Sequence, residues 1–360
     1  MWVFVFLQLI KMKNLVEKIS NWEVWPFKLI YFPITPVWFF YMLKARSVWF
    51  FSNVNPTIEF AGFEGETKKE MYDQLPKDLY PKTIYIEPYE AFDIVEIKIK
   101  KSDIQYPFVV KPNIGMHALL FRKIENKEAL KEYHTKVDVE YVLQDLIEYP
   151  MEFSVFHIRY PGETKGIITG FIQKEYLQIV GDGMDTIEEL ILKHPKAKLR
   201  LNEIFAKHSA VLNNVLEKEE IYYLSIAGNH NRGARFLNLE HEIDEQLENV
   251  FNKISNDSKH FYYGRYDFKC TSLEDLKKGK NISILEFNGV GAEPNHIYDC
   301  EMNYFRAMST ILKHWKMMYE ISEINRKAGI ERWSFKRGNK LLNFSKIFFK
   351  KLQLLETQIP

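Results

Sequence analysis

The stretch Gly264-Arg-Tyr-Asp-Phe-Lys269, followed by Ile282-Ser-Ile-Leu-Glu-Phe-Asn-Gly289, decides the fold of this chain. Both segments have the composition of β-strands, and the polar residues 277–280 between them form a turn, so the pattern predicts a hairpin. Side chains alternate between the two faces of a strand. We therefore expect Leu285 and Phe287 to face the core.

The same alternation predicts a polar site on the opposite face of the hairpin. Arg265 and Asp267 share one face of the first strand, and Glu286 and Asn288 share one face of the second. Two carboxylates and an amide oxygen form a hard-oxygen site, which suits magnesium better than zinc or iron. Arg265 beside them could stabilise an oxyanion. The alternative is a surface hairpin with cross-strand charge pairs.

A second polar feature is Tyr106-Pro-Phe-Val-Val-Lys-Pro-Asn-Ile-Gly115, an apolar strand that ends in Lys-Pro and a turn glycine. Lys111 at the end of this strand could reach phosphate oxygens while amides of the turn add donors. Many buried strands end in this way without a ligand, so this segment predicts a phosphate site only in combination with the hairpin.

Composition places the chain among ordinary globular proteins. Its 360 residues are 46% hydrophobic and 27% charged, and 49 basic against 48 acidic residues leave a net charge near +1, which gives no general attraction to nucleic acid. The only cysteines, Cys270 and Cys300, form neither a disulfide framework nor a zinc motif and suit a reducing cytosol.

Strand-like and helix-like segments alternate without strict βαβ regularity, which predicts an α+β enzyme built in layers. The further expected strands are 83–86, 108–111, 141–144, 153–159 and 166–169. The expected helices are 127–134, 186–194 and 242–255.

Together the two polar features resemble the ATP-grasp superfamily, and within it the D-alanine–D-alanine ligase-like carboxylate–amine ligases, from about Gly65 to His314. The resemblance implies the ATP-grasp fold, in which two α+β subdomains clasp ATP. Its domain would span residues 83–320, with a lid at about 104–150. An aromatic-rich region, 1–82, would precede it, and a basic amphipathic helix within 321–360 would follow.

The resemblance also implies roles for individual residues, with ATP and Mg²⁺ as cofactors. Lys111 matches the lid lysine on the ATP phosphates, and Arg265 matches the oxyanion arginine. The implied metal ligands are Asp267, Glu286 and Asn288. The other implied nucleotide contacts are Lys68, Lys174, Glu152 at the ribose, and the adenine hinge Gln144, Asp145, Leu146 and Ile147.

Two departures from the family pattern bear on activity and substrate. The lid loop after Gly115 reads Met-His-Ala-Leu-Leu-Phe121, and fewer glycines permit fewer close backbone approaches to phosphate. The segment 289–298 replaces a short proline–glycine turn, so the acceptor is expected to differ from that of a D-alanine ligase. Candidate substrate contacts are His230, Arg232, Arg235 and Glu293.

The segment 181–190 resembles a turn and helix of peptide-forming ATP-grasp ligases. A structural role explains much of it, because Thr186 can cap a helix with Glu189 three residues on.

The expected reaction is ADP-forming ligation of an amino-acid or peptide-like carboxylate to an amine through an acyl-phosphate. Two rivals stay open: an ATP-grasp kinase without an amine site, and a degenerate ATP-binding module at a membrane surface. The expected location is the cytoplasm, with possible contact at the inner face of the membrane and possible homodimerisation. No nucleic-acid partner is expected.

Both ends of the chain are unusual. The apolar run 2–10 precedes Lys11 and Lys13, which is the wrong order for a secretory signal and too short to span a bilayer; translation could equally start at Met12. Residues 22–51 are dense in aromatics and could lie in a membrane interface or pack on the protein. In the tail, apolar residues at helical spacing alternate with lysines, which predicts a basic helix that covers a domain, a dimer surface or a membrane.

Overall fold

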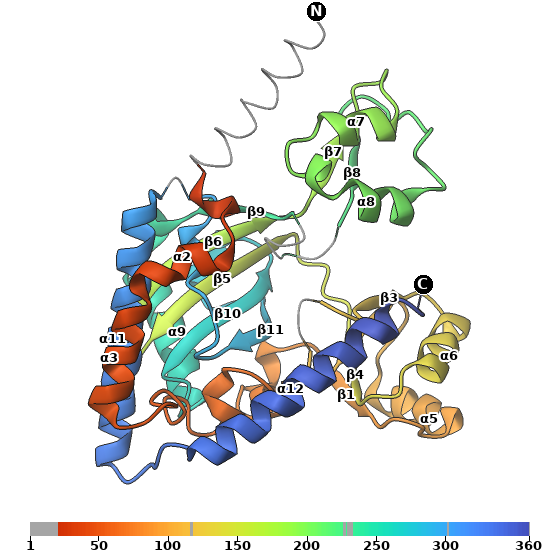
Figure 1. Ribbon diagram of the computed structural model, residues 1–360. Coiled ribbons are helices and arrows are strands. Elements are labelled where there is room, and N and C mark those ends of the chain that lie inside the picture. Colours follow the sequence, from red (N-terminus) through yellow and green to blue (C-terminus); the bar gives the residue numbers. More distant parts are fainter. Residues whose placement is uncertain (1–20, 116–117, 226–227, 229–232, 301, 360) are drawn as a thin grey trace, which may run out of the picture.

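A five-stranded antiparallel sheet forms the centre of the molecule (Figure 1). The computed structural model describes residues 21–115, 118–225, 228, 233–300 and 302–359. The sheet order is β11-β10-β5-β6-β9. Its strands are β5 (Met151–Ile158), β6 (Ile167–Glu175), β9 (Arg235–Asn238), β10 (Tyr263–Cys270) and β11 (Ile282–Asn288). The predicted hairpin is therefore confirmed as β10 and β11, which pair directly.

One face of this sheet packs against α9 (Glu245–Asp257) and α10 (Leu273–Lys277). Tyr266, Phe268 and Cys270 of β10 point into this core because alternate residues share a face, so their odd-numbered neighbours lie on the other side. The helix expected at 242–255 begins later. Asp244 is its N-cap and accepts a hydrogen bond from the amide of Leu247.

The second strand of the hairpin changes face at Leu285. Ile282 and Ile284 lie in the core with Phe287, which strict alternation forbids. The register with β10 shifts here: Phe268 lies opposite Ile284, and Asp267 lies opposite Glu286. A bulge at Leu285 therefore turns the rest of the strand over. The expectation that Leu285 faces the core is wrong, because its position is the one the bulge inserts.

A four-stranded antiparallel sheet forms a second unit, with the order β1-β4-β2-β3. Its strands are β1 (Thr83–Ile86), β2 (Phe108–Pro112), β3 (Arg122–Ile124) and β4 (Tyr141–Asp145). The helices α5 (Phe92–Ser102) and α6 (Lys127–Lys136) accompany it, and their apolar residues share a core with the sheet. This unit covers the segment in which the lid was expected.

A small lobe holds β7 (Gln178–Val180), β8 (Ile221–Tyr223), α7 (Ile187–Lys193), η5 (Ala197–Arg200) and α8 (Leu201–His208). It stands apart at the upper right of Figure 1. The helix expected at 186–194 begins one residue later, because Thr186 and Glu189 form a reciprocal capping box. The structural reading of this segment is confirmed.

The aromatic-rich region folds into short helical pieces: η1 (Trp22–Val24), α2 (Phe27–Tyr31), η2 (Phe32–Ile34), α3 (Thr35–Ala45), η3 (Glu59–Gly62), α4 (Lys68–Tyr72) and η4 (Lys77–Leu79). One side of α3 packs on the long helix α11 (Tyr304–Lys327). Tyr41 stacks on Tyr319 at 4.9 Å between ring centroids, and Trp38 meets Trp315 at 5.0 Å. Many of the rings therefore pack within the protein.

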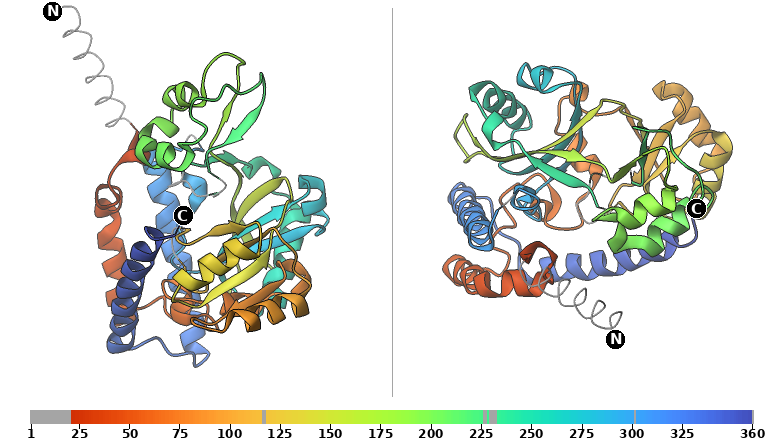
Figure 2. Two further views of the ribbon diagram at one scale, coloured as in Figure 1. Left: turned by 90° about the vertical axis from the view of Figure 1, so that its right-hand side faces the viewer. Right: turned by 90° about the horizontal axis from the view of Figure 1, so that it is seen from above.

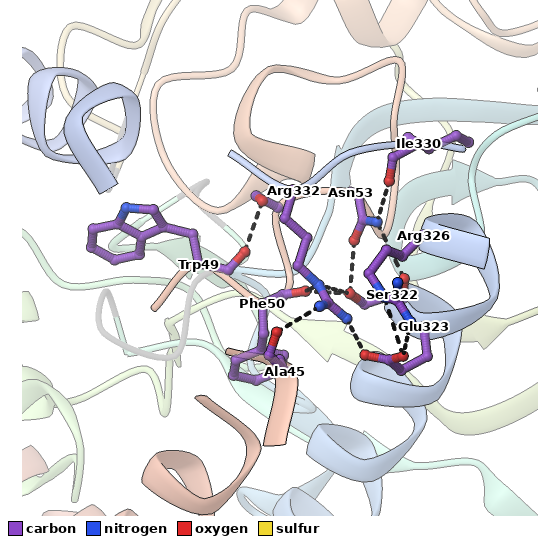
Figure 3. Close-up of polar contacts among 10 residues, drawn as sticks. Ala45, Trp49, Phe50, Asn53, Ser322, Glu323, Arg326, Ile330 and Arg332 are labelled. Atoms are coloured by element: carbon purple, nitrogen blue, oxygen red, sulfur yellow. Dashed lines mark hydrogen bonds and ion pairs between the residues drawn. The ribbon is translucent and has the colours of Figure 1, made fainter. Parts of the chain in front are cut away.

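A buried polar network fixes this region to α11 (Figure 3). Arg332 donates from Nη1 to the carbonyl of Ala45 at 2.9 Å and from Nε to Oγ of Ser322 at 3.0 Å, and it also pairs with Glu323. Asn53 donates to the carbonyl of Ile330 at 2.8 Å. Because these groups are satisfied by one another, the position of the aromatic region is well determined.

The C-terminal helix α12 (Phe335–Glu356) crosses the molecule from the end of α11 to the four-stranded unit (Figure 1). Leu352 and Leu355 join the core of that unit, and Arg122 forms an ion pair with Glu356. The short helices η7 (Glu240–Glu242) and η8 (Asn295–Ile297) complete the chain. Among the described residues, no helix is both long and apolar enough to cross a bilayer.

Candidate functional site

A polar cluster occupies the face of the hairpin that lies away from the core. Arg265 donates to Asp267 from Nε at 3.1 Å and from Nη2 at 3.2 Å. The amide of Asn288 also donates to Asp267, at 3.2 Å, and Glu286 lies opposite Asp267 in the register. The structure thus brings together four residues that the sequence placed on one face.

The charge of Asp267 is held in place by two cations. Lys174 on β6 lies 3.3 Å from its Oδ1, and the carboxylate is only 8% exposed. Burial by itself would raise the pKa of Asp267, but Arg265 and Lys174 outweigh burial and lower its pKa to about 2. Asp267 is therefore ionised at any physiological pH.

Lys174 links this cluster to β5. Its ammonium lies 3.2 Å from Glu152, which sits opposite it in the β5–β6 register. Burial disfavours the lysine's charge, but Asp267 and Glu152 overcome that effect and raise its pKa. Tyr176 donates to Glu152 at 2.5 Å. A side chain at Gly228 would place its Cβ 2.2 Å from Oε1 of Glu152, so the backbone at Gly228 approaches the acid closely.

Lys111 reaches the cluster from the other sheet. It lies on β2 of the four-stranded unit, yet its Nζ donates to the carbonyl of Leu285 on β11 at 3.2 Å. The hydroxyl of Tyr72 on α4 donates to the same carbonyl at 2.6 Å and lies 3.4 Å from the ammonium. The carbonyl of Leu285, at the β11 bulge, thus accepts a hydrogen bond from the other sheet and links the two sheets.

The ammonium of Lys111 is enclosed beside another cation. Burial, together with repulsion from Lys68, lowers the pKa of Lys111 to about 7. Lys68 itself is buried at the start of α4, and its Nζ lies 3.9 Å from Glu286. A polyanion bound here would restore the charge of Lys111.

A third acid, Glu66, stands near these groups. Its Oε2 is buried and has no hydrogen-bond partner within the part of the chain that the structure describes. Burial and the nearby carboxylate of Glu286 contribute to raising its pKa to about 7. Sequence reasoning missed Glu66 and Tyr72, because nothing in their spacing distinguishes them from residues of an ordinary loop and helix.

The segment expected to meet adenine connects the two sheets. Gln144, the last residue but one of β4, has a buried side chain that donates to Oγ1 of Thr83 at 2.6 Å. Asp145 is the last residue of β4, and Leu146 follows it. The carbonyl of Ile147 accepts a hydrogen bond from Lys269 at 2.9 Å. These residues thus lie along the connection from β4 to β5, beside the face that carries Glu152 and Lys174.

Glu293 ties the aromatic region to the cluster. Its carbonyl accepts a hydrogen bond from Nη1 of Arg265 at 3.1 Å, while its carboxylate accepts from the hydroxyls of Tyr31 on α2 and Tyr298. Tyr31 is a third contributor that the sequence did not reveal. The ring density of the region gave no sign that one hydroxyl turns toward Glu293.

The other predicted substrate contacts, Arg235, His230 and Arg232, are not part of this cluster as far as the structure describes it. Arg235 is at the start of the edge strand β9, its side chain is 66% exposed, and it pairs with Glu175 at 3.7 Å at the surface. His230 and Arg232 lie outside the described residues.

No group of three or more His, Cys, Asp or Glu side chains with metal-binding geometry occurs in the described ranges. The oxygen donors that are present, two carboxylates and one amide, fit a hard cation that keeps water or phosphate as further ligands.

No protein-family model matches the chain, and no curated protein matches it by sequence. Solved structures with some similarity include the D-alanine–D-alanine ligase from Bacillus anthracis (15% identity, TM-score 0.41, 73% of this chain and 68% of that one). Others are the VanG D-Ala:D-Ser ligase from Enterococcus faecalis (12%, 0.40, 71% and 61%) and a bifunctional glutathione synthetase from Pasteurella multocida (15%, 0.40, 69% and 36%). The chain thus spans about a third of the synthetase. TM-scores this low leave family and reaction to be argued from the site.

Proposed function

We propose that this chain is an ATP-dependent carboxylate–amine ligase of the ATP-grasp type. One observation carries the proposal. Lys111 of one sheet donates to the carbonyl of Leu285 at the β11 bulge of the other sheet, and the next residue, Glu286, lies opposite Asp267. Lysines from one side that face carboxylates on the other suit a magnesium–triphosphate, whose phosphates need cations and whose metal needs oxygen ligands.

The nucleotide would lie along the junction of the two sheets. Lys111 and Lys68 would contact its phosphates, and the low pKa of Lys111 supports this, because a buried, partly neutral ammonium gains charge when an anion binds. The connection 144–147 would hold adenine, and Glu152 with Lys174 would lie beside the ribose and the inner phosphates.

Asp267, Glu286 and Asn288 would hold Mg²⁺. The cation would neutralise charge on the phosphates during transfer. Asp267 suits this role because its low pKa keeps it ionised. Glu286 suits it because its side chain is 42% exposed and its ion pair with Lys68 is long, at 3.9 Å.

The chemistry would proceed in two steps. A substrate carboxylate oxygen attacks the γ-phosphorus of ATP, the bond to the β-phosphate oxygen breaks, and ADP leaves. The amine nitrogen then attacks the carbonyl of the acyl-phosphate, phosphate leaves, and the amine loses its proton to solvent. Arg265, fixed by Asp267 and by the carbonyl of Glu293, is positioned to stabilise the negative charge on that carbonyl oxygen.

The substrate would enter on the side of Glu293. This acid supports the proposal best among the candidate substrate contacts, since its backbone already touches Arg265. Arg235 would act only through a substrate long enough to reach the β9 edge, and His230 and Arg232 remain proposals from the sequence. A reducing cytoplasm suits the two free cysteines.

The test measures two products from one incubation. The full chain is incubated with Mg·ATP, a mixture of amino acids and hydroxylamine, and both ADP and hydroxamate are measured. We expect both products from the parent, and at least about a hundredfold less from Asp267→Asn, which removes one charge at constant size. Asp257→Asn, an exposed change in the pair with Lys253, is the matched control.

Other outcomes would decide against the proposal. Formation of ADP without hydroxamate would indicate a kinase, because only an activated carboxylate is trapped. Equal background rates in the parent and in Asp267→Asn would indicate an ATP-binding module without this chemistry.

A further inference from the structure

Helix α3 is apolar on both of its sides. Its inner side, with Trp38 and Tyr41, packs on α11. On its outer side, Phe39, Phe40 and Leu43 are 55%, 54% and 79% exposed. A surface helix of a globular protein normally turns a polar face outward, so an all-round apolar helix on the surface calls for a partner.

The elements before α3 extend this surface. Phe27, Leu29 and Phe32 in α2 and η2 are 66%, 60% and 78% exposed. With the three residues of α3 they make six large apolar side chains that are each more than half exposed, whereas single scattered ones are normal on a protein surface. Packing on α11 therefore explains the inner aromatic side chains of this region but not the exposed ones.

The charged residues of this segment have one sign. Between residues 24 and 58 the chain contains Lys28, Lys44 and Arg46 and no Asp or Glu. The ammonium of Lys44 lies over the ring of Phe40 at 5.7 Å and that of Tyr319 at 4.8 Å, so its stem follows the apolar surface.

Helix α12 adds a second strip on the same side of the molecule. Seen from above, α3 and α12 both lie along the lower edge, which is the front in Figure 1 (Figure 2). Ile347 and Leu354 are 71% and 66% exposed on α12. Four lysines of this helix are also exposed: Lys336, Lys340, Lys346 and Lys350.

We propose that the outer sides of α2, η2, α3 and α12 form one surface that binds an anionic lipid bilayer, with the helices lying in the interface. Exposed Phe and Leu would enter the boundary of the acyl chains, and the lysines would meet the acidic headgroups. The network around Arg332 holds α3 against α11, so this surface is preformed (Figure 3).

A second copy of the chain fits the surface less well. A two-fold contact through the same patch would set the basic residues of one copy near the basic residues of the other, because such an interface uses the same surface twice. An anionic bilayer instead complements the basic residues of α2, α3 and α12. The observations therefore favour lipid over self-association.

Vesicle flotation tests the proposal with the full chain. We expect the parent to float with vesicles that contain phosphatidylglycerol and to bind pure phosphatidylcholine vesicles at least about tenfold more weakly. The double substitution Phe39→Glu and Leu43→Glu should weaken binding to the anionic vesicles at least about tenfold. The matched control, Met184→Glu with Val215→Glu, changes two residues of the small lobe that are 80% and 51% exposed, and it should bind like the parent.

Circular dichroism and light scattering complete the test. Both double variants should keep the parent's helical signal and melting temperature, because all four positions are exposed. A separate variant, Lys340→Gln with Lys346→Gln and Lys350→Gln, should lose the preference for anionic lipid. Equal flotation of the parent and the α3 variant would overturn the proposal. A dimeric parent that fails to float, and becomes monomeric on changing Phe39 and Leu43, would overturn it in favour of a second copy.

Discussion

The charge of Lys111 gives a quantitative test of the proposed phosphate site. Its pKa is lowered from 10.5 to about 7 by burial and by Lys68. At pH 8 a group with that pKa is about 90% neutral, whereas beside a triphosphate it would be almost fully protonated. Binding of ATP at pH 8 should therefore take up about 0.9 proton from solution, and binding at pH 6 only about 0.1.

Isothermal titration calorimetry measures this uptake when the same titration is run in buffers of different ionisation enthalpy. A non-hydrolysable ATP analogue with Mg²⁺ serves as the ligand. The uptake should vanish in Lys111→Met. It should persist in Lys123→Met, a change on the neighbouring strand β3 that removes an exposed lysine and its surface pair with Glu125. Equal uptake by the parent and Lys111→Met at pH 8, or none in either, would refute the reasoning.

The same shift makes the stability of the ligand-free protein depend on pH. Between pH 7 and 10.5 the unfolded chain holds a proton on Lys111 that the folded chain lacks, so the free energy of unfolding rises with pH across this window. The shift corresponds to at most about 5 kcal/mol, and solvent contact of the half-buried side chain reduces this. Urea unfolding of Lys111→Met should show a flatter dependence in the same window.

Three further substitutions test contacts around the site. Lys174→Met leaves Glu152 and Asp267 buried without their shared cation and should lower the free energy of unfolding in urea by about 3–5 kcal/mol, whereas Lys253→Met at an exposed pair should cost less than about 1 kcal/mol. Tyr72→Phe removes the donor to the Leu285 carbonyl and should cost about 1 kcal/mol and weaken binding of the ATP analogue several-fold; unchanged affinity would show that Tyr72 does not position Lys111. Gly289→Ala would place a Cβ 2.3 Å from the carbonyl of Ala61 and should lower the melting temperature by several degrees; an unchanged value would contradict the close approach.

The hairpin was predictable because alternation is a local property. Arg265 and Asp267 share a face from their spacing alone, and Tyr266 and Phe268 mark the opposite face as core. The change of face at Leu285 was not predicted, although the sequence carried a sign of it. Ile284 and Phe287 differ in parity, so both can be buried only if the strand contains an extra residue.

Contacts between distant segments were beyond sequence reasoning. Lys111 and Leu285 are separated by 174 positions, and Tyr31 and Glu293 by 262, so no spacing rule connects them. The resemblance to a known family pointed to Lys111, but it gave no reason to single out Tyr72 or Glu66, whose importance depends on burial. For the same reason, the aromatic density of the N-terminal region predicted apolar packing without showing that α3 is apolar on two sides.

The central claim is that the two sheets hold one magnesium–triphosphate between them. Equilibrium dialysis with a non-hydrolysable ATP analogue and Mg²⁺ tests it directly, using one substitution on each sheet, Lys111→Met and Glu286→Gln. The parent should bind one nucleotide per chain, and each substitution should weaken binding at least about tenfold, while Lys123→Met leaves it unchanged. Absence of saturable binding by the parent, or parent-like binding by both variants, would contradict the claim.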